Sequence, residues 1–228
     1  MIQVFSDENF KNTNAYLIYN DKLEGILIDT ANNKYTDIIK FCKKNGILIT
    51  DIFITHGHFP HFYGINEICK EFGHPNVYIG KDDLIMMFDS SKNLSSFYNV
   101  LDSDWHPLPI RNLKVITKHE ERVINGYDIV IIPAPGHTAG SIIIEFSKLK
   151  CIFNGDSLFL DHDVIGVAGM TDDEIQVLNS IKFIFDNYTN GYSLFPGHFE
   201  HSFTIRELLE KNNIIKKRYY KIINGNEL

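Results

Sequence analysis

Three histidines lie close together in the segment ITHGHFPHFYG, residues 54–64. His56 and His58 are two positions apart at the end of an apolar run, so in an extended chain their imidazoles project to the same side. His61 follows where the chain is expected to turn into a helix. Neutral imidazole is a ligand for zinc, iron and similar metals. A cluster of three in so short a segment therefore predicts a metal site rather than a structural role.

Two further histidines share one sequence motif, an apolar strand that ends in Pro-Gly-His. IVIIPAPGH ends at His137 and YSLFPGH ends at His198. The Pro-Gly pair ends each strand sharply and leaves the histidine at a sheet margin, where sites tend to be built. Between them, CIFNGDSLF places Asp156 after another apolar strand. An acid there is often a turn residue, but beside five imidazoles it is the natural anionic ligand.

The elements that must position these residues alternate between strands and helices. In the first half, AYLIY, GILIDT, DIFIT and NVYIG are strand-like, while KYTDIIKFCKKNG and FYGINEICKEFG have helical spacing. In the second half, YDIVIIPAPGH, SIIIEFS, CIFNGDSLF and YSLFPGH are strand-like, DDEIQVLNSIKFIFDNY is an amphipathic helix, and TIRELLEKNNIIKKRYYKII predicts one closing helix. Two strand-rich halves with helices at intervals predict stacked sheets covered by helices, an α/β fold with αββα layering.

Composition limits the functional classes. The 228 residues are 44% hydrophobic and 22% charged, which is ordinary for a globular enzyme and favours a single domain over residues 1–228. The formal net charge of -7 argues against nucleic acid or an anionic membrane as the main partner. A small-molecule substrate is the expected partner, and the sequence carries no signal for the oligomeric state.

The amino-terminal segment MIQVFSDENFKNTN has no basic region followed by an apolar stretch, and the chain has no apolar run long enough to span a membrane. Cys42, Cys69 and Cys151 are far apart, odd in number and form no CxxC pair. A disulfide framework or a cysteine zinc site is therefore not expected. We predict buried, reduced thiols and a cytoplasmic location.

Residues 81–108 are irregular and rich in apolar side chains, including Met86, Met87, Phe88, Phe97, Tyr98 and Trp105. A helix that caps the core is one interpretation. A lid over a substrate pocket is the other.

The motifs NAYLIY, GILIDT, THGHFPHFYG, PAPGHTAGS, IFNGDSLF and FPGH occur in order along nearly the whole chain. With them the chain resembles the metallo-β-lactamase superfamily, and especially its glyoxalase II-like hydrolases. The resemblance implies the αββα sandwich of two mixed sheets, with a metal site at one edge formed by loops from both halves.

The resemblance also implies ligand roles. It makes His56, His58 and His137 the ligands of a first metal. Asp156 would bridge to a second metal, which His61 and His198 would help to hold. Asp29, in LIDT, matches a position that supports the histidine loop from behind; as an alternative, it merely closes a strand.

The chain departs from the family motif HxHxDH at Pro60, which replaces the aspartate. That aspartate is a ligand of the second metal in the family, whereas proline has no side-chain donor or acceptor. Its fixed φ suits the first turn of a helix. We therefore expect one firmly bound ion, zinc first with iron or manganese as alternatives, and a weakened second site. Glu200 and His201 are candidate substitute ligands or ordinary loop residues.

Three functions follow from this pattern. The leading one is hydrolysis of a small ester, thioester or lactone-like substrate by metal-bound water that Asp156 orients. A mononuclear iron oxygenase similar to the persulfide dioxygenases of the superfamily is the second. A catalytically weakened member that binds a ligand is the third, supported by Pro60 alone. The absence of an export signal disfavours β-lactam hydrolysis.

Overall fold

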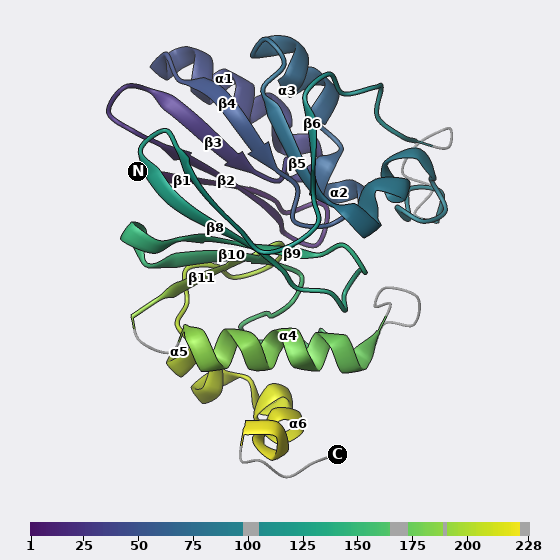
Figure 1. The fold of residues 1–228 in the computed structure, drawn as a ribbon, viewed down its shortest axis with the longest axis vertical. Helices are drawn as coiled ribbons and strands as arrows, with labels where there is room; N and C mark the ends of the chain where they lie inside the picture. Colours follow the sequence, from purple (N-terminus) through teal and green to yellow (C-terminus); the bar gives the residue numbers. More distant parts are fainter. Residues whose placement is uncertain (98–104, 165–172, 189–190, 224–228) are drawn as a thin grey trace.

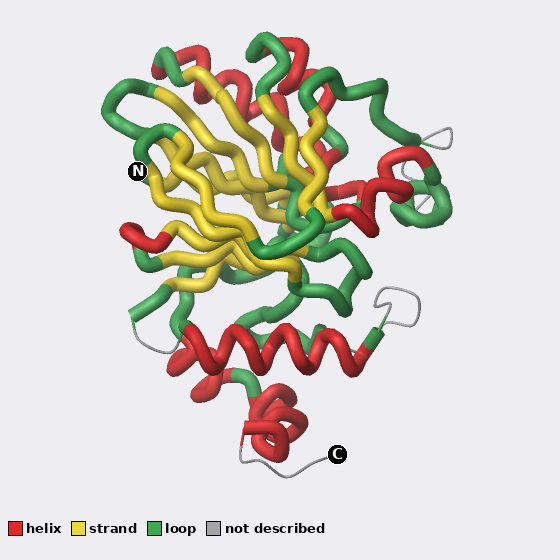
Figure 2. The backbone as a smooth tube through the Cα atoms, in the orientation of Figure 1, coloured by secondary structure: helices red, strands yellow, loops and turns green. Residues whose placement is uncertain are grey.

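The computed structural model describes residues 1–97, 105–164, 173–188 and 191–223. Two stacked β-sheets form its centre, and helices cover their outer faces (Figures 1 and 2). The first sheet has the order β1 (Ile2–Asp7), β2 (Thr13–Tyr19), β3 (Glu24–Ile28), β4 (Leu48–Phe53), β5 (Asn76–Gly80) and β6 (Leu113–Ile116). The second has the order β11 (Ser193–Pro196), β10 (Cys151–Gly155), β9 (Ile142–Phe146), β8 (Tyr127–Pro133) and β7 (Glu120–Ile124). The predicted αββα sandwich is thereby confirmed.

Both sheets are mixed. In the first sheet β1, β2 and β3 are antiparallel neighbours, whereas β3, β4, β5 and β6 run parallel. In the second sheet β10 and β11 are parallel and the other pairs are antiparallel. The carboxyl ends of parallel strands meet at one edge of a sheet, so the residues that follow β3, β4 and β5 lie near one another.

The helices form two outer layers around three apolar clusters. α1 (Tyr35–Asn45), α2 (Phe59–Phe62) and α3 (Ile65–Glu71) accompany the first sheet, while α4 (Glu174–Asn187), α5 (Ile205–Lys211) and α6 (Asn213–Ile223) accompany the second (Figure 1). One cluster packs between the sheets, around Tyr16, Phe53 and Phe153. The other two fill the space between each sheet and its helices. Short 3₁₀ helices, η1 (Asn32–Lys34), η2 (Lys81–Phe88) and η3 (Ser147–Leu149), lie in the connections.

Three strands, β1, β6 and β7, were not expected from the sequence. Each lies at an edge of its sheet, and β7 has three exposed residues in a row. An edge strand has a partner on one side only and is often exposed, so it lacks the long apolar run that marks a central strand.

The prediction of one closing helix is wrong, because the chain breaks at Asn212. The buried Asn212 Oδ1 accepts hydrogen bonds from the backbone N–H groups of Ile214 and Ile215, at 3.1 and 3.0 Å, and so caps α6. Its Nδ2 donates to the carbonyls of Phe159 and His162, at 3.2 and 3.1 Å. An asparagine with these partners ends one helix and starts the next.

The region 81–108 begins with η2, which packs on the first sheet. Met86 and Met87 are buried there, whereas Phe88 and Phe97 are exposed. The prediction of a segment that caps the core is therefore confirmed for η2. Residues 98–104, which include Tyr98, lie outside the described residues.

Two further predictions concern burial and membrane insertion. All three cysteines are buried, as expected, and burial raises the pKa of Cys42 and Cys151 to about 12 and that of Cys69 to about 11. Among the helices of the described ranges, none combines the length and the apolar character needed to cross a membrane.

Candidate metal centre

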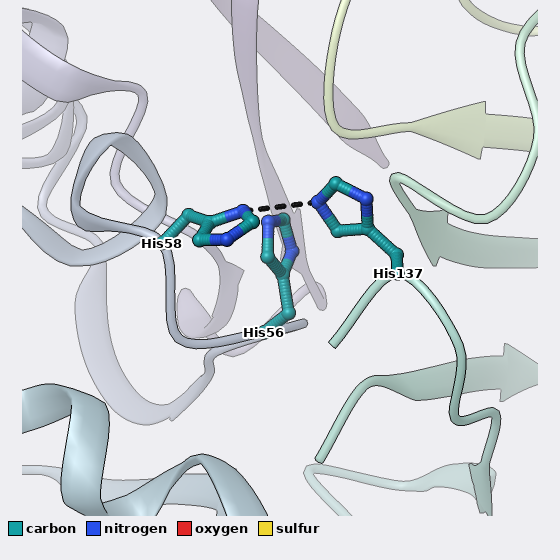
Figure 3. Close-up of side chains that lie close together, drawn as sticks. All are labelled: His56, His58 and His137. Atoms are coloured by element: carbon teal, nitrogen blue, oxygen red, sulfur yellow. Dashed lines mark hydrogen bonds between the residues drawn. The ribbon is translucent and has the colours of Figure 1, made fainter. Parts of the chain in front are cut away.

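The structure brings His56, His58 and His137 together from the two halves of the chain. His56 and His58 follow β4, and His137 follows β8. Their imidazoles point toward one another (Figure 3), and the ligand atoms of all three lie within 4.8 Å of each other. His58 Nδ1 and His137 Nε2 are 3.0 Å apart. Two nitrogens that each bind a tetrahedral zinc ion at 2.0–2.1 Å would be about 3.3 Å apart, so this spacing fits such an ion.

Asp156, which follows β10, lies among the ring nitrogens. Its Oδ2 is 3.4 Å from His198 Nε2, 3.5 Å from His137 Nε2 and 3.9 Å from His56 Nε2. Its Oδ1 is 3.8 Å from His61 Nε2. Four of the five predicted histidine ligands thus lie within 4 Å of one carboxylate, and His58 joins the cluster through His137.

Three of these buried atoms have no hydrogen-bond partner among the residues that the structure describes: His56 Nε2, His61 Nε2 and Asp156 Oδ1. Leaving a buried polar atom unpaired costs about 1–3 kcal/mol. Because His56, His61 and Asp156 also form a second group whose ligand atoms lie within 4.8 Å of one another, the donor set fits a metal cation.

Asp29 fixes the orientation of two rings from behind. Its carboxylate accepts from Thr55 N at 2.8 Å, from Thr55 Oγ1 at 2.7 Å and from His61 Nδ1 at 2.9 Å. The Thr55 hydroxyl in turn lies 3.1 Å from His56 Nδ1. Since these contacts occupy the Nδ1 atoms, both rings present Nε2 to the centre. Asp29 therefore does more than close a strand: it holds His61, and through Thr55 it holds His56.

His198 is oriented by the loop that joins β1 to β2. Its Nδ1 lies 3.0 Å from the carbonyl oxygen of Lys11, so its Nε2 faces Asp156. Gly197, which precedes it, leaves room for this arrangement. A Cβ at Gly197 would lie 2.3 Å from Asp156 Oδ1 and 2.7 Å from His61 Cε1.

Burial sets the charge state of the centre. Burial, with the nearby histidines, lowers the pKa of His58 and His198 to about 3, and it lowers the pKa of His56 and His137 well below 6.5. Burial raises the pKa of Asp156 to about 6, while the charges of His61 and Lys11 oppose it. At neutral pH the four imidazoles are therefore uncharged with their lone pairs available, as metal ligands must be.

His61 behaves differently from the other four histidines. Burial lowers its pKa, but the charges of Asp156 and Asp29 and the hydrogen bond to Asp29 outweigh burial, so the pKa is raised.

Asp83 was not singled out from the sequence. This fully buried residue of η2 accepts from Gly57 N and Thr138 Oγ1, each at 2.6 Å, and from Gly140 N at 2.7 Å. It thereby joins the loop of His56 and His58 to the loop of His137. One signal was available: Asp83 comes three residues after β5, which is parallel to β4, so both segments emerge at the same sheet edge.

Pro60 stands at the first turn of α2, where the sequence predicted it, and His58 is the residue before that helix. Pro60 is buried and borders a cavity beside the centre. The proposed substitute ligands are not brought into the cluster: Glu200 is exposed 3.8 Å from Lys211, and the His201 ring packs against Tyr16.

Comparison with known proteins agrees with this geometry. The model of the metallo-beta-lactamase superfamily matches residues 9–193. The chain belongs to this superfamily. The recognised resemblance is thus confirmed, and so is the fold that it implied.

Curated relatives of this superfamily member include two probable metallo-hydrolases. The one from Streptococcus pyogenes is 26% identical over 81% of this chain and 78% of its own length. The one from Methanocaldococcus jannaschii is 30% identical over 82% of this chain and 88% of its own. A hydroxyacylglutathione hydrolase of Legionella pneumophila is 24% identical over 86% of this chain and 64% of its own.

Solved structures share the fold. The B3 metallo-beta-lactamase BLEG-1 has a TM-score of 0.82 and 22% identity, covering 94% of this chain and 99% of its own. TTHA1623 in a di-iron-bound form has a TM-score of 0.74 and 20% identity over 92% of this chain and 98% of its own. ETHE1 from Myxococcus xanthus has a TM-score of 0.70 and 16% identity, covering 100% of this chain and 92% of its own.

Proposed function

We propose that this protein is a metal-dependent hydrolase of a small ester, thioester or lactone-like substrate. The observation that carries the proposal is the convergence of buried imidazoles on Asp156, where three ring and carboxylate atoms have no hydrogen-bond partner in the described part of the chain. The probable metallo-hydrolases and the hydroxyacylglutathione hydrolase among its relatives support the same class of chemistry.

The predicted site residues have different roles in this proposal. His56, His58 and His137 would hold a first ion, with Asp156 as its anionic neighbour. A bound zinc ion lowers the pKa of water toward neutrality and polarises a carbonyl group. Asp156, whose pKa is about 6, is mostly ionised at pH 7 and can accept a hydrogen bond from an attacking water and orient it. Asp29 and Thr55 keep the rings in position.

We propose that one ion binds firmly and that the second position is weak. His61, His198 and a share of Asp156 would serve the second position, but Pro60 withholds the carboxylate that the family motif supplies there. Loss of a supporting residue alone typically costs roughly 10–100-fold in metal affinity or activity, so loss of a ligand should cost at least that. Zinc is the proposed metal; iron and manganese accept similar donor sets.

The test is hydrolysis by protein reconstituted with zinc, against a panel of small esters, thioesters and lactones, with metal content measured on the same sample. Turnover that disappears on chelation and returns with zinc is expected. Metal-loaded protein that leaves the whole panel untouched would contradict the proposal and favour the alternative of a catalytically weakened, ligand-binding member.

A second candidate is a mononuclear iron oxygenase of the persulfide dioxygenase type. The Asp156 carboxylate lies 3.8 Å from His61 Nε2 and 3.4 Å from His198 Nε2. Two imidazoles and one carboxylate are a set that suits Fe(II) with open positions. Oxygen uptake with glutathione persulfide, by protein loaded with iron and not with zinc, would separate this function from hydrolysis. A small-molecule substrate and a cytoplasmic location are part of both proposals.

A further inference from the structure

The cavity beside the candidate metal centre has a volume of about 210 Å³. Five of its lining residues belong to the predicted ligand set. The rest of the lining divides into two chemical kinds. Lys11, His162 and Asp163 are polar. Lys11 and His162 are exposed, so they lie toward solvent, and Asp163 is partly exposed. The apolar part consists of Phe10, Pro60, Leu94, Phe159, Val164 and Phe199.

The most buried apolar residues of this lining are Pro60, Phe159 and Val164; Phe159 is 6% exposed and Val164 is 7% exposed. Pro60 adjoins the predicted ligand His61 in the chain, at the position where the family motif has an aspartate. A metal ligand has therefore been replaced by a hydrocarbon surface at the inner end of the cavity. Proline also has no N–H, so neither its side chain nor its nitrogen can donate a hydrogen bond.

The facing wall is held by packing and by hydrogen bonds. The Phe159 and Phe199 rings meet edge to face at 5.4 Å, and the Phe199 ring stacks on His162 at 3.7 Å. Asn212, far along the chain, binds the carbonyls of Phe159 and His162. These contacts fix the wall, so an apolar surface is available without rearrangement.

We propose that this cavity binds a short, unsubstituted apolar acyl group of the substrate, and that Pro60 is a residue that determines this specificity. The inference rests on the proposed function and deepens it. An alkyl chain gains from leaving water for such a surface. A hydroxyl group that faced Pro60 would lose its water partners without replacement, which disfavours hydroxyacyl groups there.

The experiment measures binding apart from catalysis. Dissociation constants of acetate, propionate and butyrate are determined by ligand-observed NMR on zinc-loaded protein. The carboxylate is common to the series, so differences report on the alkyl chain. We expect affinity to rise up to about fourfold for each added methylene, the fold-change that follows from about 0.8 kcal/mol per buried CH₂.

Two variants test whether the alkyl chain binds against Pro60 and Val164. Pro60→Ser and the near-isosteric Val164→Thr each place a hydroxyl in the lining. Each should reduce the gain in affinity per added methylene by at least about half. Pro133→Ser, the same change at an exposed position at the end of β8, should leave the wild-type series intact. A flat series in the wild type, or an undiminished series in both cavity variants, would overturn the inference.

The corresponding acyl thioesters separate the two proposals. Chain-length-dependent binding without hydrolysis of these thioesters or of any ester or lactone of the panel would contradict the proposed hydrolase and support the acyl cavity. Hydrolysis at a rate independent of chain length, together with flat binding, would support the hydrolase and overturn the acyl cavity.

Discussion

The carboxylate of Asp83 accepts a hydrogen bond from the backbone N–H of Gly57 at 2.6 Å, directly between His56 and His58. The same carboxylate holds Thr138 and Gly140, next to His137. A Cβ at Gly140 would lie 2.4 Å from the backbone nitrogen of Asp83, so the two segments are in close contact. One buried side chain therefore sets the distance between the two loops that supply the first three imidazoles.

Replacement of Asp83 by asparagine should weaken metal binding by roughly 10–100-fold, the usual effect of losing a residue that positions ligands. An amide keeps one acceptor but turns donors toward the N–H and hydroxyl groups that the carboxylate now satisfies. Competition with a chromophoric zinc chelator measures the affinity.

Asp51→Asn provides the matched control for Asp83. Like Asp83, Asp51 is a buried aspartate, but it lies within β4, and its carboxylate accepts from Tyr78 and Asn76 rather than from the histidine loops. Equal zinc affinities of the two variants would show that Asp83 has no special role at the centre.

Pro60→Asp should increase the number of bound ions from one to two per chain, because it restores a carboxylate beside His61. Plasma mass spectrometry on protein dialysed against zinc counts the ions. Pro60→Asn, which is similar in size but uncharged, should stay at one. If the wild type already carries two tightly held ions, the role given to Pro60 is wrong.

Asp29→Asn should reduce zinc affinity while the fold is retained. Asp29 has a φ of 56°, a left-handed conformation that asparagine tolerates well, so the backbone stays in place. The negative charge beside His61 and the second acceptor for Thr55 are lost, and the rings of His56 and His61 are then less well oriented. Zinc titration followed by the spectrum of a cobalt-substituted sample measures both affinity and ligand geometry. An unchanged cobalt spectrum would contradict the orienting role.

The stability of the metal-free protein should fall as the pH is lowered below 6.5. His56, His58, His137 and His198 have pKa values lowered by burial, so the unfolded chain binds protons that the folded chain excludes. Asp156 acts in the opposite sense, since its folded pKa of about 6 exceeds the ordinary 3.8. Four groups outweigh one, and each net proton changes the free energy of unfolding by about 1.4 kcal/mol per pH unit.

Urea denaturation at pH 6.5, 5.5 and 4.5 measures this dependence. A variant with His58→Gln has one fewer buried imidazole and should lose part of the slope. His61, with its raised pKa, is protonated in both states below pH 6.5 and contributes stability that is lost only as the pH rises through its folded value. Stability that stays level or increases on acidification would contradict the prediction.

The sequence by itself determined the layered fold and the gathering of the six predicted ligands. Apolar strands that end in HGH, PGH and NGD carry their own stop signals, and the parallel pair β10 and β11 brings Asp156 and His198 to one edge of the second sheet. The central strands could be predicted because most of their residues are apolar. The edge strands β1, β6 and β7 could not, since their identity depends on a neighbour that the local sequence does not specify.

Only the tertiary structure decided how the site is held and what it borders. In the sequence, Asp83 is one acid at the start of a segment rich in apolar side chains. It acquires its role because η2 packs against one loop 26 residues before it and another 55 residues after it. The sequence predicts that Asn212 lies inside a helix, yet in the structure it supports the wall formed by Phe159. From the sequence, Pro60 indicates only the loss of a ligand. That it lines an apolar cavity depends on side chains from distant segments. Contacts between distant residues are fixed by packing, and no local pattern encodes them.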